Sequence, residues 1–387
     1  MKICNNIIFV FMLVFMINLS SLNLSILGIG RLGICTALCF EQAGFNVLGL
    51  DLSPSYIDDI NNKALKSPEP YVNEYLAKSK NLKATTSLDE ALNFSDIYFI
   101  VVPTPSGAYE AYDHSILSSL LIEINKRKIK NKHVVICCTV FPGYIKNIAS
   151  HLLSDCKNTT ISYNPEFIAQ GNIIKGFENP DMILIGEGSK EIGDILEEIY
   201  KKTCKNTPKI CRMSPPSAEI TKLAINCFVT TKIAFANSIG DAADLTEGAN
   251  KVDILNAVGS DSRVGNKYLM PGYGFGGPCF PRDNRALGSY IKLIGLNPLL
   301  QKTTDNLNKM HAEFMASHLN KRALDEYIFE DVNYKDNCKV VIIEESQKLA
   351  VAEILAKQGK SVTIKDKLNV VNEVRKKYGN LFNYLVV

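Results

Sequence analysis

The chain has 387 residues, enough for two or three domains with large buried cores. Its 43 lysine and arginine residues and 40 aspartate and glutamate residues give a net charge of +3, and 46% of the chain is hydrophobic. This near-neutral balance disfavours a nucleic-acid-binding protein with a strongly basic face. The eleven cysteines and five histidines show no spacing typical of a metal site, so no metal is expected.

Residues 1–22 differ from the rest of the chain. Lys2 precedes an apolar run at 7–17, which has the length of a signal-peptide core but is too short to span a bilayer comfortably. Only one positive residue precedes the run, and no clear cleavage site follows it. A disordered or misassigned start is therefore favoured, and a signal or membrane anchor stays open as the alternative.

From residue 23 onward, apolar runs alternate with stretches of helical spacing, the pattern of a parallel sheet covered by helices on both faces. A second region begins with one long helix, from about Ser214 to Ala243. After a glycine-rich segment at 265–277, helical spacing continues to Lys321, and a short alternating tail follows. The predicted strands are 24–27, 46–50, 97–102, 134–136, 160–163 and 182–185, with early helices at 32–43 and 115–125.

The first predicted strand leads directly into a glycine motif, Gly28-Ile29-Gly30-Arg31-Leu32-Gly33. Such glycines permit a tight turn and the close approach of a pyrophosphate, and the N-terminus of the following helix attracts phosphate charge. Asp51 ends the next strand, where a carboxylate can accept hydrogen bonds from an adenosine ribose. Together these residues indicate dinucleotide binding, with NAD preferred over NADP; a purely structural turn is the alternative.

A second glycine-rich loop, 274–277, leads into Pro278 and Cys279 at the expected start of a helix. A helix N-terminus stabilises a thiolate, and Asp283 lies one turn further on, on the same side. Free backbone amides beside Cys279 could also stabilise an oxyanion, as acyl chemistry requires. The other ten cysteines are expected to be buried, reduced apolar residues.

Further polar residues lie where a site could form. Lys222 and Asn226 share one face of the long helix among apolar neighbours, although a surface ion pair between Glu219 and Lys222 is an equal alternative. Thr139 and Glu166 each follow a predicted strand, at the edge where open α/β sheets keep their active sites. Alone, Glu166 would more often be a turn residue.

Taken together, these motifs resemble the UDP-glucose/GDP-mannose dehydrogenase family of nucleotide-sugar 6-dehydrogenases over residues 23–366. The Thr104-Pro105 turn adds to the resemblance, and the stretch 274–287, similar to the family's cysteine motif, is its most specific part. The resemblance implies an α/β fold in three parts. These are an N-terminal Rossmann-like, doubly wound parallel sheet at 23–211, a central helical dimerisation domain at 212–321, and a shortened C-terminal α/β nucleotide-sugar-binding domain at 322–387.

The chemistry implied by the resemblance is the oxidation of a sugar C6 alcohol to a carboxylate by two NAD, without release of the aldehyde. Cys279 would form a thiohemiacetal and then a thioester. Asp283 and Lys222 would hold the water that takes the first proton, and Lys222 with Asn226 would stabilise the negative oxygen. Glu166 and Thr139 would position or activate the water that hydrolyses the thioester.

The resemblance also implies binding residues. Arg263 and Lys335 suit a diphosphate, and Arg263 would come from a neighbouring subunit, so a homodimer is the minimum expectation; solvated surface charges are the alternative. NAD would be bound by the residues of the 28–33 motif together with Asp51, Thr104 and Thr139. The nucleotide sugar would be bound by Glu166, Phe167, Ile168, Lys222, Asn226, Arg263, Tyr268, Gly276 and Lys335.

Two departures from the family pattern bear on affinity. Gln170 stands in a segment where relatives carry an acid and a base, and Glu344 replaces an arginine that contacts NAD in relatives. UDP-glucose is the expected substrate; GDP-mannose, a UDP-hexosamine, or binding of a nucleotide sugar without turnover are the alternatives. NAD, nucleotide sugars and a free thiol are cytosolic, so the cytoplasm is the expected location.

Overall fold

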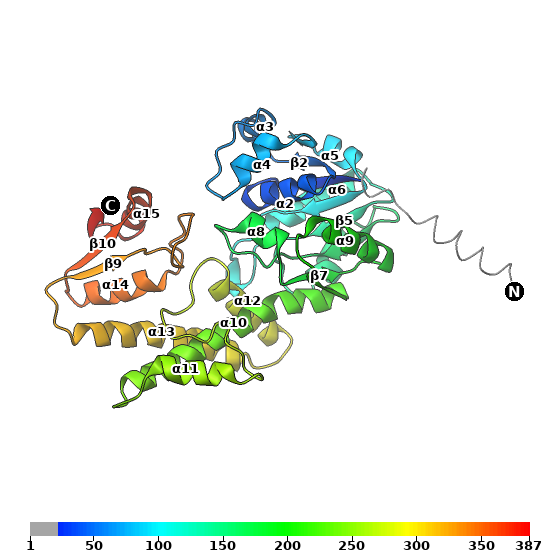
Figure 1. Cartoon of the computed structure of the whole chain (residues 1–387). Helices are drawn as coiled ribbons and strands as arrows, with labels where there is room; N and C mark the ends of the chain where they lie inside the picture. The colour runs from blue at the N-terminus through cyan, green and yellow to red at the C-terminus, as the bar shows by residue number, and fades with distance from the viewer. Residues whose placement is uncertain (1–21) are drawn as a thin grey trace. The chain divides into compact units, whose positions relative to one another are not determined.

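A computed structural model describes residues 22–387, so the apolar run at 7–17 lies outside the described residues. The described chain forms two compact units (Figure 1). Unit 1 contains residues 22–105 and 114–219, and unit 2 contains residues 106–113 and 220–387. The sequence predicts one continuous first domain over 23–211, whereas the short segment 106–113 groups with unit 2.

Unit 1 is built on an eight-stranded sheet with the strand order β3-β2-β1-β4-β5-β6-β7-β8. Each predicted strand is present, within two residues of the predicted ends. The strands are β1 (Asn23–Leu27), β2 (Asn46–Leu50), β3 (Leu82–Thr85), β4 (Ile97–Ile100), β5 (His133–Ile136), β6 (Thr160–Tyr163), β7 (Met182–Gly186) and β8 (Lys209–Met213).

The sheet departs from the all-parallel prediction at one place. The pairs from β3 to β6 are parallel, as is the β7–β8 pair, but β6 and β7 are antiparallel and meet only at Tyr163 and Gly186. The last residue of β6 therefore lies opposite the last residue of β7, and the two strands run in opposite directions. The carboxyl ends of β1, β4, β5 and β6 still share one edge, where open α/β sheets form their sites.

Helices cover both faces of this sheet, as predicted. One buried core lies under α2, α3, α4, α8 and α9, and the other under α5, α6 and the π-helical segment η3. These helices are α2 (Arg31–Gln42), α3 (Pro54–Asn61), α4 (Val72–Lys78), α5 (Leu88–Phe94), α6 (Ser115–Lys126), η3 (Ile145–Ala149), α7 (Ser150–Leu152), α8 (Ile173–Glu178) and α9 (Lys190–Thr203).

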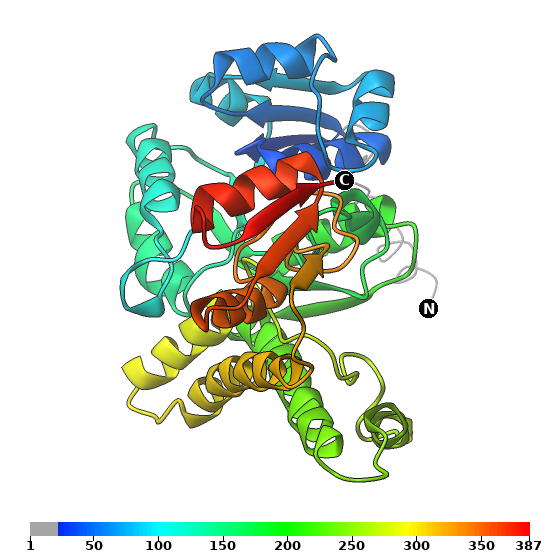
Figure 2. The ribbon, with the colours of Figure 1, turned by 90° about the vertical axis from the view of Figure 1, so that its left-hand side faces the viewer.

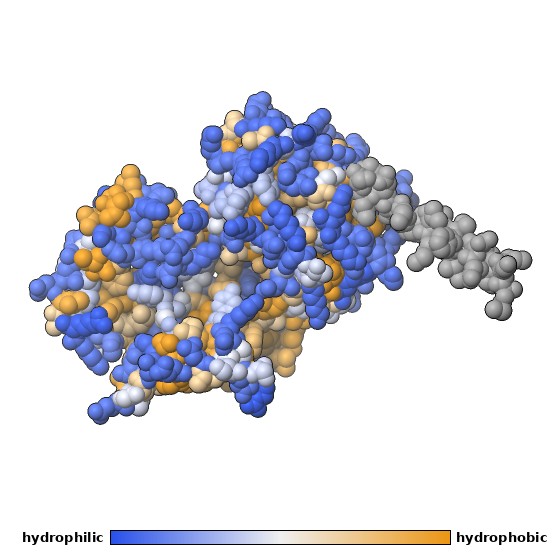
Figure 3. Space-filling model, in the orientation of Figure 1, coloured by the Kyte–Doolittle hydropathy of each residue, from blue (hydrophilic) through white to orange (hydrophobic). Residues whose placement is uncertain are grey.

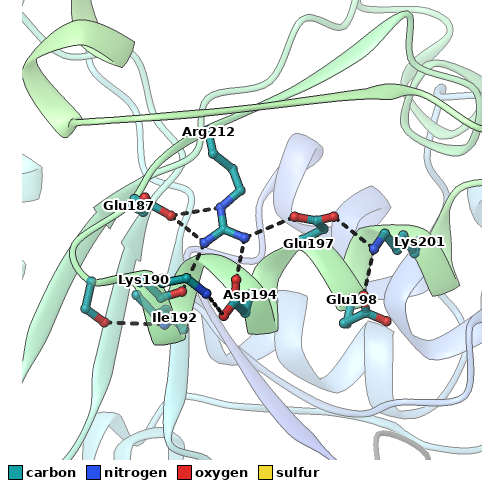
Figure 4. Close-up of polar contacts among 9 residues, drawn as sticks. Glu187, Lys190, Ile192, Asp194, Glu197, Glu198, Lys201 and Arg212 are labelled. Carbon is teal, nitrogen blue, oxygen red and sulfur yellow. Dashed lines mark hydrogen bonds and ion pairs between the residues drawn. The ribbon is translucent and has the colours of Figure 1, made fainter.

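An ion-pair network fastens the edge strand β8 to α9 (Figure 4). The Arg212 guanidinium lies 2.7 Å from Glu187, 2.5 Å from Asp194 and 3.1 Å from Glu197. Lys201 joins the network through Glu197, at 2.8 Å. Because the Arg212 side chain is only 22% exposed, these contacts are less screened than ordinary surface pairs.

Unit 2 combines a helical part with a small sheet. Its strands β9, β10 and β11 are parallel, and α15 lies across them (Figure 2). The long helix α10 (Pro215–Asp244) begins in unit 1, has Pro215 in its first turn and continues into unit 2. The remaining elements are η2 (Ala108–Glu110), α11 (Lys251–Ser260), α12 (Phe280–Leu293), α13 (Leu299–Asn320), β9 (Tyr327–Glu330), α14 (Gln347–Lys357), β10 (Val362–Asp366), α15 (Leu368–Tyr378) and β11 (Asn383–Val386).

Residues 22–387 contain neither a candidate membrane-spanning helix nor a candidate metal cluster. No helix in this range is both long enough and apolar enough to cross a membrane. No three histidine, cysteine or acidic side chains in this range are grouped so that they could hold a metal ion.

Candidate functional site

The glycine motif forms a tight turn between β1 and α2. Gly28 has a φ of +98°, and a Cβ there would lie 2.4 Å from the Val101 carbonyl oxygen. A Cβ at Gly33 would lie 2.1 Å from the Gly28 oxygen, so this helix packs against the turn as closely as only glycine allows. Gly30 is the N-cap of α2, and a Cβ there would meet no described atom within 4 Å. The space over the helix N-terminus is therefore open to a ligand.

These residues fit a dinucleotide. The open space at Gly30 adjoins the first-turn amides of α2, which favour phosphate. Asp51 is half-buried at the end of β2 and accepts a hydrogen bond from the Ser53 amide at 3.2 Å. Within the motif, Ile29 is buried and contributes to the core, whereas the exposed Arg31 donates to Gln170 Oε1 at 2.7 Å.

The loop that follows β5 is fastened at three points within unit 1. The Thr104 hydroxyl donates to the Thr139 carbonyl at 2.8 Å, so these two predicted residues lie together. The Phe141 amide donates to His114 Nε2 at 3.2 Å. The carboxylate of Glu219 accepts from two further amides of the loop, Gly143 at 2.6 Å and Ile145 at 2.8 Å.

Glu219 is fully buried and Lys222 is only 7% exposed, which excludes the alternative interpretation of the two residues as an ion pair on the surface. Burial raises the pKa of the Glu219 carboxyl, and the two amide hydrogen bonds act in the opposite direction. Its spacing to Lys222 along the helix suggested a surface pair; its real partners lie more than 70 residues earlier, in the Thr139 loop. Sequence spacing carries no signal for such a contact.

Glu166 follows β6 and is half-buried. Asn164, two residues before Glu166, anchors this segment with two hydrogen bonds. Its side-chain amide donates to the Leu184 carbonyl at 2.9 Å, and its side-chain oxygen accepts from the Tyr200 hydroxyl at 2.5 Å. Tyr200 also approaches Glu166 Oε1 at 3.4 Å. The predicted substrate residues Phe167 and Ile168 are both partly buried against the cores of unit 1.

In unit 2, Cys279 is the N-cap of α12, as predicted. Of the ten cysteines in the described chain, it is the exposed one; six are buried and three are half-buried. Asp283 follows in the first turn of the helix, and its amide donates to the Cys279 carbonyl at 2.8 Å. The side chain of Asp283 is only 1% exposed.

Lys222 and Asn226, the predicted polar residues of α10, lie near Cys279 and Asp283. Asn226 Nδ2 donates to Asp283 Oδ2 at 2.6 Å, and Lys222 is 7% exposed on the same helix face. The hydroxyl of Tyr112 donates to Asp283 Oδ1 at 2.7 Å. Tyr112 is the residue of this cluster that sequence reasoning missed.

The Cys279 thiol does not have the lowered pKa that a helix N-terminus predicts. Partial burial by surrounding protein and the negative charge of Asp283 raise its pKa above the ordinary value, and Glu344 adds to this effect. The positive charges of Arg282 and Lys222 lower it. The thiol is therefore mostly protonated at neutral pH.

The glycine loop before Cys279 is held rigidly. Asn308 binds both backbone groups of Phe275, each at 2.9 Å. The Gly277 amide donates to the Glu344 carbonyl at 3.0 Å, and a Cβ at Gly276 would lie 2.3 Å from the Glu345 carbonyl oxygen. The predicted substrate residue Gly276 thus lies where the loop meets the 344–345 segment.

The remaining predicted substrate residues, Arg263, Tyr268 and Lys335, also belong to unit 2. Arg263 is 86% exposed and pairs with Asp261 at 2.7 Å. Tyr268 is 54% exposed, with its ring edge-on to Phe280 at 6.3 Å. The Lys335 ammonium lies 5.5 Å from the ring centroid of Tyr334.

Comparison with known proteins shows which family and which enzymes this chain resembles. The model of the UDP-glucose/GDP-mannose dehydrogenase family, NAD binding domain, matches residues 22–204, and that of the central domain matches 216–310. A UDP-glucose 6-dehydrogenase of Rickettsia bellii is 31% identical over 77% of this chain and 69% of the relative. A GDP-mannose 6-dehydrogenase of Pseudomonas syringae is 32% identical over 74% and 69%. The structure of a UDP-glucose dehydrogenase from Pyrobaculum islandicum has a TM-score of 0.85 and 27% identity, covering 95% of this chain and 86% of that one.

Proposed function

We propose UDP-glucose as the substrate, since the chain belongs to the UDP-glucose/GDP-mannose dehydrogenase family and is an NAD-dependent nucleotide-sugar 6-dehydrogenase. The proposed reaction converts the C6 alcohol of the sugar to a carboxylate, with two NAD reduced and one water consumed. The observation that carries the oxidation to an acid is the exposed Cys279 at the start of α12, with Asp283 and Asn226 beside it.

Two NAD molecules, bound one after the other, would each accept one hydride. In the first oxidation, Lys222 and Asp283 hold a water that takes the C6 hydroxyl proton. The sulfur of Cys279 then forms a bond to the aldehyde carbon, and the thiol proton passes to the aldehyde oxygen. This thiohemiacetal stays attached to the chain, so no aldehyde is released.

The second oxidation removes a hydride from the same carbon and the proton from its hydroxyl, which leaves a thioester on Cys279. Asn226 and the ammonium of Lys222 stabilise negative charge on the oxygen through these steps. Water then adds to the thioester carbon, the carbon–sulfur bond breaks, and the thiol leaves with a proton. Glu166 and Thr139, which unit 1 supplies, are proposed to position or activate that water.

Similarity to known enzymes bears on the identity of the sugar and the base. Both a UDP-glucose and a GDP-mannose dehydrogenase are about equally similar to this chain. A structure with a high TM-score is a UDP-glucose dehydrogenase, which favours UDP-glucose. Arg263 and Lys335 are proposed to bind the diphosphate, a feature that both substrates share.

A substrate comparison tests the assignment. The purified full chain is supplied with excess NAD and, in parallel, UDP-glucose, GDP-mannose or a UDP-hexosamine, and the initial rate of NADH formation is recorded. We expect kcat/KM to be highest with UDP-glucose and to fall strongly when NADP replaces NAD, because Asp51 would repel a 2′-phosphate. A higher kcat/KM with either other nucleotide sugar would contradict the substrate assignment and leave the reaction class intact.

A further inference from the structure

Residues 106–113 form a small hairpin that belongs to unit 2 although its neighbours in the chain belong to unit 1. Ser106 and Tyr112 pair across it, and the Gly107 amide donates to the Ala111 carbonyl at 2.7 Å. The hairpin is attached to α12, because the Ser289 hydroxyl donates to the Tyr109 carbonyl at 2.7 Å. It therefore lies against the helix that carries Cys279 and Asp283.

Tyr112 is the residue by which this hairpin reaches the buried carboxylate. Its side chain is 5% exposed, and its hydroxyl donates to Asp283 Oδ1 at 2.7 Å. The guanidinium of Arg282 lies 5.0 Å from the centroid of the Tyr112 ring and 3.3 Å from Asp283 Oδ1. The ring is thus fixed by a cation on its face while its hydroxyl binds the carboxylate.

Both oxygens of Asp283 are consequently held by donors from separate elements. Asn226 of α10 binds Oδ2 at 2.6 Å, and Tyr112 with Arg282 binds Oδ1. A carboxylate held at both ends cannot rotate, and its remaining lone pairs point in fixed directions. A phenol that donates to a carboxylate also disperses part of its negative charge.

We propose that Tyr112 is a positioning residue that fixes the orientation of the Asp283 carboxylate and moderates its charge toward the Cys279 thiol. This inference rests on the proposed function, in which Asp283 helps to hold the water of the first step. Tyr112 touches neither substrate nor cofactor in this role. It acts through Asp283.

The test compares Tyr112→Phe with a matched control on the same hairpin, Tyr109→Phe. Tyr109 is 92% exposed, and its contact to Ser289 uses the backbone, so the control removes a hydroxyl without disturbing the hairpin. For Tyr112→Phe we expect kcat to fall about 5- to 30-fold, with KM for NAD and the nucleotide sugar unchanged within about twofold. Tyr109→Phe should behave as the wild type. A Tyr112→Phe enzyme with wild-type kcat would overturn the proposal.

A second measurement does not depend on turnover. Because the charge of Asp283 raises the pKa of Cys279, loss of the phenol should strengthen that effect and slow alkylation of Cys279 by iodoacetamide. We expect a decrease of about two- to fivefold at mildly alkaline pH, read from the Cys279 peptide by mass spectrometry. An unchanged alkylation rate in Tyr112→Phe would contradict the proposal, whether or not the enzyme oxidises a nucleotide sugar. If the wild type oxidises no nucleotide sugar but alkylation is slower in Tyr112→Phe, only the proposed function is contradicted.

If Tyr112→Phe does not fold, Ser289→Ala gives an independent test. This substitution removes only the hydrogen bond from Ser289 to the Tyr109 carbonyl. Both kcat and the rate of Cys279 alkylation should therefore fall, but by less than in Tyr112→Phe. Wild-type values of both quantities in Ser289→Ala, together with a misfolded Tyr112→Phe, would assign Tyr112 a purely structural role.

Discussion

At the residue scale, the protonation of Cys279 controls its chemistry. A thiol with a raised pKa is largely protonated at neutral pH, and only the thiolate is strongly nucleophilic. The proposed reaction agrees with this, because addition to the aldehyde delivers the thiol proton to the new hydroxyl. Glu344 adds a negative charge that opposes ionisation of the thiol.

Glu344→Gln should therefore lower the pKa of Cys279. At a pH below the thiol pKa, the thiolate fraction and the alkylation rate of Cys279 should rise about two- to fivefold. The rate is followed from pH 7 upward with iodoacetamide, and the Cys279 peptide is quantified by mass spectrometry. The control is Glu313→Gln, which removes an exposed acid of α13 and should leave the profile unchanged. A Glu344→Gln profile that overlays the wild type would contradict the assigned influence of this residue.

At the element scale, the loop after β5 depends on Glu219 of α10. The carboxylate offers acceptors to two backbone amides, and a glutamine would face one of them with its own N–H group. Glu219→Gln should lower the free energy of unfolding by about 1–3 kcal/mol, the cost of an unsatisfied buried amide. Urea denaturation measures this loss, with the exposed Asp58→Asn of α3 as the control. Equal midpoints for the two variants would show that the amides find other acceptors.

The elements that could be predicted from the sequence are those with continuous apolar runs. β2 and β6 begin and end where predicted, because both are interior strands, and β2 is buried over four of its five residues. β3 and β8 were not predicted, because they form the two edges of the sheet and carry charged residues, among them Lys83 and Arg212. A strand that faces solvent on one edge needs no uninterrupted apolar run.

In the candidate site, too, some features could be predicted from local sequence and others could not. Local spacing pairs Cys279 with Asp283 at the start of α12 and Lys222 with Asn226 on one face of α10, but the contact between Asn226 and Asp283 joins residues 57 positions apart. The contact of Tyr112 with Asp283 joins residues 171 positions apart in the chain, and local pattern holds no information about it. The contact that Tyr112 makes with the Asp283 carboxylate thus depends on tertiary packing.

At the scale of the whole molecule, the long helix α10 leaves large apolar side chains exposed. Phe228 is 66% and Phe235 is 47% exposed, and a spacing of seven residues places them on one face. Apolar surface is visible over the part of unit 2 that contains α10 and α11 (Figure 3). Exposed aromatic residues in line on a helix are typical of a subunit interface, which supports the proposed homodimer.

Phe228→Asp should therefore weaken self-association. Light scattering coupled to size exclusion is expected to give twice the chain mass for the wild type and a mass near that of one chain for the variant. Ile116→Asp on α6 of unit 1, which also alters an exposed apolar residue, should leave the mass unchanged. A wild type that elutes with the mass of one chain at micromolar concentration would contradict the dimer.

The proposed mechanism oxidises one nucleotide sugar twice through Cys279. Its most direct measurement is the amount of NADH formed from a limiting, weighed amount of UDP-glucose with excess NAD, for the wild type and for Cys279→Ala. We predict two NADH per sugar for the wild type, and for Cys279→Ala a rate lower by at least about a hundredfold. One NADH per sugar in the wild type, or undiminished turnover in Cys279→Ala, would contradict the covalent four-electron mechanism.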